Sequence, residues 1–295
     1  MRAAAILGLG CSPKDLKPFQ CEPGVKWHIG MPGLHDADVI LLFGGDGTIH
    51  RHLGQLVKLG LPVLAIPAGS GNDFASSLGL PRVRDSLSAW KQFCSGPTNV
   101  RKIDLGTISP ILRPGDTPSM QGSRYFCCVA GVGLDGEVAR RANQLPRCLR
   151  GNGGYVLSVV PTIFTFAPFP LKILEQDATT SSWGIRTNGT TLLAVFANTP
   201  LYGGGMRVAP EAKVDDGLLD VCKVGAVSPL RLFRLFPTVY TGHHLKIREV
   251  EYFHASRLRV VTETPMDVYA DGEYVCRTPI DVSIQRAALK VISPA

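Results

Sequence analysis

The residues of this chain best suited to chemistry form two glycine-rich segments that follow apolar runs. In the first, Gly44-Gly45-Asp46-Gly47-Thr48 comes directly after residues 39–43, and Ile49 and His50 begin a stretch whose apolar side chains repeat with a helical period. This pattern predicts a strand-to-helix turn. Its glycines would let the backbone approach a ligand closely, and free amides at a helix start attract anionic oxygen atoms. A phosphate group would therefore fit at this turn.

The second segment strengthens this interpretation, because a glycine-rich turn alone is weak evidence for phosphate binding. Residues 61–67 form another apolar run, which is followed by Gly69, Ser70, Asn72 and Asp73 at the start of a short helix. Because the carboxyl ends of neighbouring parallel strands meet at one edge of a sheet, we expect the two turns to lie side by side. Residues 44–50 match neither the Rossmann nor the Walker glycine pattern.

Each polar residue in these turns also has a purely structural explanation. Ser70 could only cap the helix that follows it, and Asn72 and Asp73 could serve only as helix-start residues. Asp46 is more informative, since a carboxylate within a phosphate-binding loop repels its ligand unless a cation lies between them. A role for Asp46 in organising Mg-ATP is therefore favoured.

The remaining pattern divides the chain into two parts. Residues 1–106 alternate strands with helices, which is typical of an α/β domain with a doubly wound parallel sheet. The expected strands lie near residues 3–8, 38–43, 61–66 and 100–105, and the expected helices near 48–59, 73–79 and 84–94. Residues 107–295 are expected to form an antiparallel, β-rich domain with turns at Asn188-Gly189, Asp216-Gly217 and Asp271-Gly272.

The sequence also predicts the structure of three segments in the second part. Ser228 and Pro229 suit the start of a helix that would end at Gly242. Residues 155–171 are apolar but contain three prolines, so they are expected to form a core helix ending near Pro168 and not a membrane span. Residues 113–119 are expected to form an exposed loop.

Composition limits the class of partner. Lys and Arg outnumber Asp and Glu by 31 to 24, and the net charge of +7 favours an anionic partner. No basic run resembles a nucleic-acid motif, so nucleic acid is not expected as a partner. None of the eight cysteines forms a C-x-x-C pair, and Cys127 and Cys128 are expected to point to opposite faces of one strand. Reduced thiols in a cytoplasmic protein are therefore favoured.

The two turns and several later blocks resemble the diacylglycerol kinase catalytic family, which includes sphingosine kinases and bacterial lipid kinases of the YegS type. The blocks follow family order and span about residues 39–281. They comprise residues 44–48, 67–75, 104–106, 129–136, 198, 202–206, 209–220 and 271–273. The resemblance implies that the α/β domain (1–106) binds nucleotide and that the β-rich domain (107–295) receives the lipid.

The resemblance also implies cofactors and site residues. The cofactors are ATP and Mg²⁺, and the nucleotide site would comprise Gly44, Gly45, Asp46, Gly47, Thr48, Ile49, His50, Gly69, Ser70 and Asn72. Asp271 would accept the proton of the lipid hydroxyl, with Glu273 as a weaker second candidate. A structural Mg²⁺ would be held by the Asp216 carboxylate and the main-chain oxygens of Lys213 and Leu218.

The expected protein is thus an ATP-dependent lipid kinase that is cytoplasmic and peripheral to the membrane. Its substrate would be a lipid with a free hydroxyl, such as diacylglycerol or a sphingoid base, and the residues do not choose among such lipids. Part of residues 155–171 would line the wall that receives acyl chains, unless it is only core. Arg140, Arg141, Arg147 and Arg150 would meet anionic phospholipid, unless they form only a solvated helix face. A homodimer is left open.

Two rival functions remain. An NAD kinase shares the GGDGT turn and the general fold, but the blocks at 202–206, 209–220 and 271–273 resemble the lipid branch. A catalytically silent protein that binds lipid or nucleotide is the other rival. It gains weight from residues 9–38, a short, loop-like stretch where the family has more chain and a threonine that contacts the nucleotide. No adenine-contacting residue can be named in that stretch.

Overall fold

The computed structural model describes residues 1–112, 122–144, 152–177 and 179–294, and it begins with a parallel sheet. This sheet contains β1 (Arg2–Leu7), β2 (Lys26–Ile29), β3 (Val39–Gly44) and β4 (Val63–Pro67), in the order β2-β1-β3-β4. All six residues of β3 are buried, as expected for a parallel strand that is covered on both faces. The predicted fold class is confirmed.

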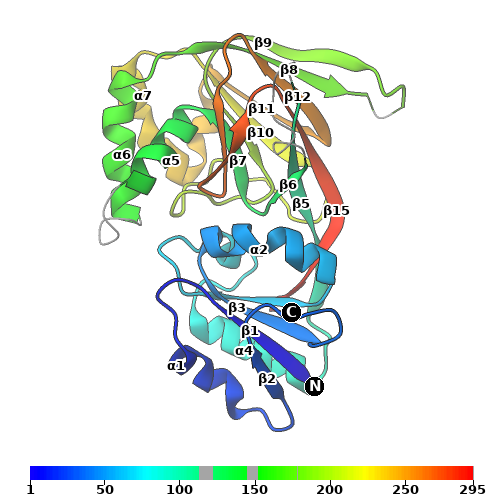
Figure 1. Cartoon of the computed structure of the whole chain (residues 1–295). Coiled ribbons are helices and arrows are strands. Elements are labelled where there is room, and N and C mark those ends of the chain that lie inside the picture. Colours follow the sequence, from blue (N-terminus) through cyan, green and yellow to red (C-terminus); the bar gives the residue numbers. More distant parts are fainter. Residues whose placement is uncertain (113–121, 145–151, 178, 295) are drawn as a thin grey trace.

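Helices cover both faces of this sheet. Figure 1 shows α2 (Asp46–Leu59) on the face that is turned toward the second part of the molecule, with α4 (Val83–Ser95) on the opposite face. The α2 helix ends at Gly60, whose left-handed φ of 63° suits a glycine C-cap. The short helix α3 (Asp73–Ser77) follows β4. The strand-turn-helix arrangement predicted for both glycine segments is thus present.

The stretch from 9 to 38 is more regular than the sequence suggests. It contains α1 (Pro13–Leu16), the 3-10 helix η1 (Lys17–Cys21) and the edge strand β2, which pairs in parallel with β1. Ser12 caps α1, and Phe19 is fully buried and accepts a hydrogen bond from the Trp90 indole. The prediction of a loop-like stretch was therefore wrong, because short elements carry too few residues for a readable period.

The second part is an antiparallel assembly of strands. It contains β6 (Arg124–Phe126), β7 (Val129–Gly133), β8 (Phe169–Gln176), β9 (Trp183–Ala197), β10 (Leu219–Gly225), β11 (Val250–Ala255), β12 (Arg257–Thr262), β13 (Asp267–Ala270) and β14 (Glu273–Arg277). The turn predicted at Asn188-Gly189 does not exist, since both residues lie within β9 and pair with β8. The turn at Asp271-Gly272 is present as the two-residue link between β13 and β14.

Two long strands join the parts. β5 (Val100–Pro110) pairs antiparallel with β15 (Ile280–Ile292), and Val291 of β15 pairs in parallel with Val63 of β4. The expectation that residues 100–105 add a parallel strand was wrong, because the C-terminal strand takes the place beside β4. Strand β15 therefore completes the first sheet. The domain bounds 1–106 and 107–295 stay a prediction.

Three helices pack on one side of the second part: α5 (Leu134–Gln144), α6 (Asn152–Thr165) and α7 (Pro229–Leu235) (Figure 1). α6 ends before Pro168, as predicted. The helix expected up to Gly242 changes after Leu235 into the 3-10 helix η4 (Phe236–Thr241), which contains Pro237. In the described residues, no helix is long and apolar enough to cross a membrane. The predicted loop at 113–119 lies outside the described residues.

Candidate active site

The two glycine turns touch each other through their backbones. A Cβ atom placed on Gly69 would come within 2.3 Å of the Gly45 Cα, and the Asp46 amide donates to the Gly71 carbonyl at 3.2 Å. Such an approach leaves no room for any side chain at either glycine. The turns therefore form one continuous backbone surface at the carboxyl ends of β3 and β4, where the sequence placed them.

Asp46 joins the two turns through its carboxylate. Oδ2 accepts the Asp73 amide at 3.0 Å and Oδ1 accepts the Phe74 amide at 3.0 Å, so Asp46 caps the start of α3. Burial and the negative charge of Asp73 raise the pKa of Asp46 to about 7, against the lowering effect of the two amides. A divalent cation beside Asp46 would stabilise its ionised form.

Asp73 links these turns to the second part of the molecule. Its carboxylate accepts the amides of Gly204 and Gly205 at 2.9 and 3.1 Å. Burial raises the pKa of Asp73 even though these amides stabilise its charge. The loop from Tyr202 to Met206 is thereby held against the two glycine turns.

The other predicted nucleotide-binding residues differ in what they can contact. Asn72 closes the second turn by exchanging two hydrogen bonds with Gly69, at 3.0 and 2.8 Å. Ser70 is exposed, and it lines a polar cleft together with Thr48. The Ile49 side chain is buried in the core, so only its main chain could meet a ligand. His50 points to Asp271, with its Nδ1 3.0 Å from Oδ2.

Asp271 is fixed by four N–H groups. It lies in a two-residue turn in which Asp271 and Gly272 have φ values of 50° and 82°, the left-handed pair that Asp-Gly suits. Its Oδ2 accepts the Cys127 amide at 2.9 Å and the His50 ring, while its Oδ1 accepts the amides of Cys128 and Val129 at 2.8 and 3.2 Å. The Asp271 side chain has no exposed area. No local pattern in the sequence predicts these partners.

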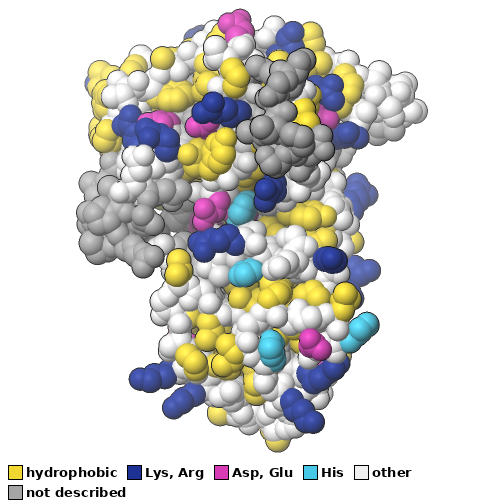
Figure 2. Space-filling model, in the orientation of Figure 1, with side chains coloured by type: hydrophobic (Ala, Val, Ile, Leu, Met, Phe, Trp, Pro, Cys, Tyr) yellow, Lys and Arg dark blue, Asp and Glu magenta, His cyan; other side chains and the backbone are white. Residues whose placement is uncertain are grey.

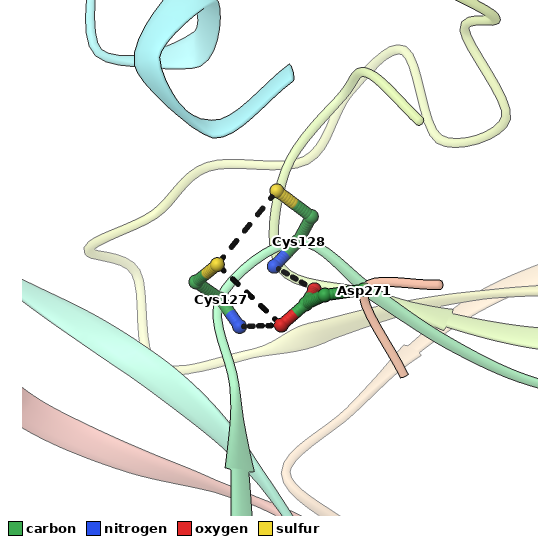
Figure 3. Close-up of side chains that lie close together, drawn as sticks. All are labelled: Cys127, Cys128 and Asp271. Carbon is green, nitrogen blue, oxygen red and sulfur yellow. Dashed lines mark hydrogen bonds between the residues drawn. The ribbon is translucent and has the colours of Figure 1, made fainter. Parts of the chain in front are cut away.

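Cys127 and Cys128 were expected on opposite faces of a strand, and this was wrong. They lie in the bend between β6 and β7, and their sulfur atoms are 4.0 Å apart beside Asp271 (Figure 3). The bend exists because the amides of residues 127–129 turn to Asp271 and because Asn198 donates to the Cys127 carbonyl. Both thiols are free, and burial raises the pKa of Cys128 to about 12.

His50 contacts the Asp271 carboxylate directly, and Glu273 follows Asp271 by two residues. Burial lowers the pKa of His50, but the hydrogen bond and negative charge of Asp271 outweigh this effect and leave that pKa raised. Glu273, the second predicted catalytic residue, lies at the rim, where its carboxylate is 3.4 Å from the Arg51 guanidinium. Among the predicted catalytic pair, Asp271 is thus held in place and Glu273 is half-exposed.

Two cavities with shared lining residues lie at this site. The polar cleft has a volume of about 330 Å³ and is lined by both glycine turns, by Asp271 to Glu273 and by Tyr202 to Gly204. A second cavity of about 120 Å³ is lined almost entirely by apolar atoms, including those of Val159, Ile163, Leu232 and Leu235. Asp135 and Tyr202 line both cavities. A polar cleft suited to phosphates therefore adjoins an apolar pocket.

The predicted structural magnesium site lies in the loop before β10. Asp216 and Lys213 are exposed, and the Asp216 Oδ1 accepts the Leu218 amide at 3.0 Å. One carboxylate and two main-chain oxygens are hard donors that suit Mg²⁺. The loop has a second support, because the buried Asp104 accepts the amides of Gly217 and Ala287, both at 2.7 Å.

We expect Asp216→Ala to abolish the stabilisation that Mg²⁺ gives in the absence of nucleotide, because an ion bound only by the native state raises the free energy of unfolding by mass action. At a Mg²⁺ concentration of about 100 Kd, this loss would be about 2.7 kcal/mol. Melting curves with Mg²⁺ or EDTA measure it. Asp215→Ala removes a neighbouring exposed carboxylate and serves as the control. The site is refuted if Asp216→Ala responds to Mg²⁺ as the wild type does.

The basic cluster is only partly described. Arg140 and Arg141 both pair with Glu137 at 2.7 Å, which lowers the pKa of that carboxyl to about 2. Arg147 and Arg150 lie outside the described residues. On the described part of the face in Figure 2, Lys and Arg side chains are spread over both parts of the molecule and do not form a single patch. The positive charges of Arg140 and Arg141 are therefore partly balanced by the carboxylate of Glu137.

Comparisons with known proteins agree with this architecture. A model of the diacylglycerol kinase catalytic domain matches residues 32–108, and one of the YegS C-terminal NAD kinase beta sandwich-like domain matches residues 128–293. A diacylglycerol kinase of Mycobacterium tuberculosis is 34% identical over 258 residues, covering 87% of this chain and 77% of the relative. A diacylglycerol kinase of Bacillus subtilis is 28% identical over 243 residues, covering 82% and 73%.

Solved structures share the fold at lower identity. A diacylglycerol kinase from Bacillus anthracis has a TM-score of 0.65 at 18% identity, covering 99% of this chain and 96% of that one. An NAD kinase from Archaeoglobus fulgidus in complex with ATP has a TM-score of 0.54 at 13% identity, covering 99% and 94%. At these identities the likeness concerns the fold alone.

Proposed function

Because this chain belongs to the diacylglycerol kinase catalytic family and is a lipid kinase, we propose that it transfers the γ-phosphoryl group of ATP, with Mg²⁺, to the hydroxyl of a lipid. Diacylglycerol is the first acceptor to consider, since relatives covering more than four-fifths of the chain are named diacylglycerol kinases. Sphingoid bases and related lipids present a similar hydroxyl above an apolar chain.

The observation that carries this proposal is that the polar cleft and the apolar cavity share the lining residues Asp135 and Tyr202. A lipid is amphiphilic, so its chain would enter the apolar pocket while its hydroxyl stays at the polar cleft. Burial of each CH₂ group would contribute about 0.8 kcal/mol to binding. NAD is polar along its whole length and would leave the apolar pocket unfilled, which disfavours the NAD kinase alternative.

The glycine turns would hold the phosphates of ATP. The amides at the start of α2 and the positive end of its dipole attract anionic oxygens, and Thr48 and Ser70 add hydroxyl groups at the cleft. Bound Mg²⁺ would neutralise negative charge on the phosphates. Asp46 and Asp73 both line the cleft and supply the hard carboxylate oxygens that such an ion prefers.

Asp271 would accept the proton of the lipid hydroxyl. Its three amide donors hold the carboxylate in place, and a loose phosphoryl-transfer transition state needs little help from a base before the proton leaves. The His50 ring nitrogen hydrogen-bonds this carboxylate, so His50 is the partner that an incoming hydroxyl would displace. Positioning would then provide most of the acceleration.

Peripheral contact with the membrane remains part of the proposal. Phe164, Leu230 and Phe233 are large apolar side chains with exposed fractions of 52%, 55% and 44%. They lie on α6 and α7, the two helices that also line the apolar pocket, and the rings of Phe164 and Phe233 are 6.0 Å apart. An apolar surface beside the pocket would let a lipid pass from a membrane into it.

The function is tested by offering labelled ATP with a panel of hydroxylated lipids in mixed micelles. We expect label in at least one phospholipid product, and the panel ranks diacylglycerol against sphingoid bases, ceramide and isoprenoid alcohols. Tight ATP binding without turnover on any lipid would instead favour a silent nucleotide-binding protein.

A further inference from the structure

Three potential metal-binding atoms lie together beside the polar cleft. The sulfur atoms of Cys127 and Cys128 are 4.0 Å apart, and the Cys127 sulfur is 3.5 Å from the Asp271 Oδ2. One donor atom from each of the three residues lies within 4.8 Å of the other two. Figure 3 shows both thiols and the carboxylate gathered at this bend.

These spacings match the edges of a tetrahedral zinc centre. With Zn–S bonds of about 2.3 Å and Zn–O bonds of about 2.0–2.2 Å, two sulfurs lie about 3.8 Å apart, and a sulfur and an oxygen about 3.5–3.7 Å apart. We propose that Cys127, Cys128 and Asp271 form a three-ligand site for a thiophilic divalent cation such as Zn²⁺, and that this ion blocks the kinase reaction.

The surroundings of the site favour a cation. Cys128 and Asp271 line the polar cleft, which gives an ion a path from solvent, and Asp46 and Asp73 line the same cleft and add negative charge. The two thiols would release their protons to the solvent, so that two thiolates and one carboxylate surround the ion.

Ligand softness separates this site from a magnesium site. Thiolates select Zn²⁺ and similar ions, whereas Mg²⁺ prefers oxygen ligands and gives up its water reluctantly. The inhibitory part of the proposal rests on the proposed function, because it requires Asp271 to serve the phosphoryl-transfer step. Inhibition by Zn²⁺ should therefore persist when Mg²⁺ is raised, since the two ions do not share this site.

Cd²⁺ provides a spectroscopic test, because Cd–thiolate bonds absorb in the ultraviolet. Chelator-treated protein, kept reduced with a phosphine, is titrated with Cd²⁺. We expect one equivalent to produce the thiolate band, and Cys127→Ala or Cys128→Ala to weaken Cd²⁺ binding by at least about 10²-fold. Cys222→Ala removes another fully buried thiol, away from Asp271, and should leave the band unchanged.

The outcomes separate binding from function. An unchanged thiolate band in the Cys127→Ala, Cys128→Ala double variant would overturn the site, as would the absence of a band in folded wild-type protein. If Cd²⁺ binds here but kinase activity is unaffected, the inhibitory part is wrong. If no lipid is phosphorylated at all, the proposed function fails, while the absorption titration still decides the metal site.

Discussion

Asp271→Asn should lower kcat on the lipid acceptor by about 10²- to 10⁴-fold while ATP still binds, the usual effect of removing a positioned general base. A loss toward the lower end of that range would suit a loose transition state in which the proton is transferred late. Single-turnover rates on the preferred lipid and equilibrium ATP affinity are the two measurements.

The structure adds a complication to this variant. An asparagine amide would present its own NH₂ group to at least one N–H donor, so the variant loses a hydrogen bond as well as a base. His50→Ala removes one of the same contacts and leaves the Asp271 carboxylate in place, so we expect it to reduce kcat by less than about 10-fold. Near-wild-type kcat in Asp271→Asn would place the base elsewhere, with Asp46 as the first residue to examine.

Gly47→Val should weaken ATP binding by at least about 10²-fold with little loss of stability. A Cβ atom at Gly47 would approach only the ends of the flexible Glu273 and Arg51 side chains, at 2.8 and 3.8 Å, so the fold can accommodate it. The added methyl groups would occupy the cleft where phosphate oxygens meet main-chain amides. Loss of one or two hydrogen bonds to a charged group, each contributing about 1.5–3 kcal/mol, accounts for the size of the effect.

Gly45→Val is the informative comparison. From the sequence alone it is the obvious substitution to block the ligand and leave the fold intact, but a Cβ there would lie 2.4 Å from the Gly71 carbonyl oxygen. We therefore expect Gly45→Val to lower the melting temperature as well as ATP affinity, since two backbones must separate. Calorimetric ATP titration and melting curves distinguish the two variants. Undiminished ATP affinity in folded Gly47→Val protein would show that the first turn is only structural.

Local patterns in the sequence were sufficient to predict the helices, strands and turns that carry the site. An apolar strand, a glycine turn and a helical period predicted β3 and α2, and Asp271-Gly272 predicted the tight turn between β13 and β14. These signals depend on residues that are neighbours in the chain. The same is true of the two glycine turns, whose adjacency follows from the general geometry of parallel strands.

Contacts between distant residues could not be predicted in this way. Asp46 caps a helix that begins 27 residues later, and Asp271 holds amides more than 140 residues away, so neither contact leaves a local pattern. Side chains alternate along a strand, and this rule places Cys127 and Cys128 on opposite faces. The rule cannot show that the amides of these residues donate to the Asp271 carboxylate and not to a neighbouring strand. The return of β15 to β4 was missed for the same reason.

We expect the phosphoryl acceptor to be a lipid hydroxyl, with the lipid chain in the apolar pocket. The most direct measurement offers labelled ATP and Mg²⁺ to the purified chain with diacylglycerol micelles and NAD in the same tube, and then separates the lipid from the aqueous phase. We predict that label transferred from ATP appears in the lipid phase as a phosphorylated lipid. Label in NADP with none in any lipid would show that the acceptor is NAD and not a lipid.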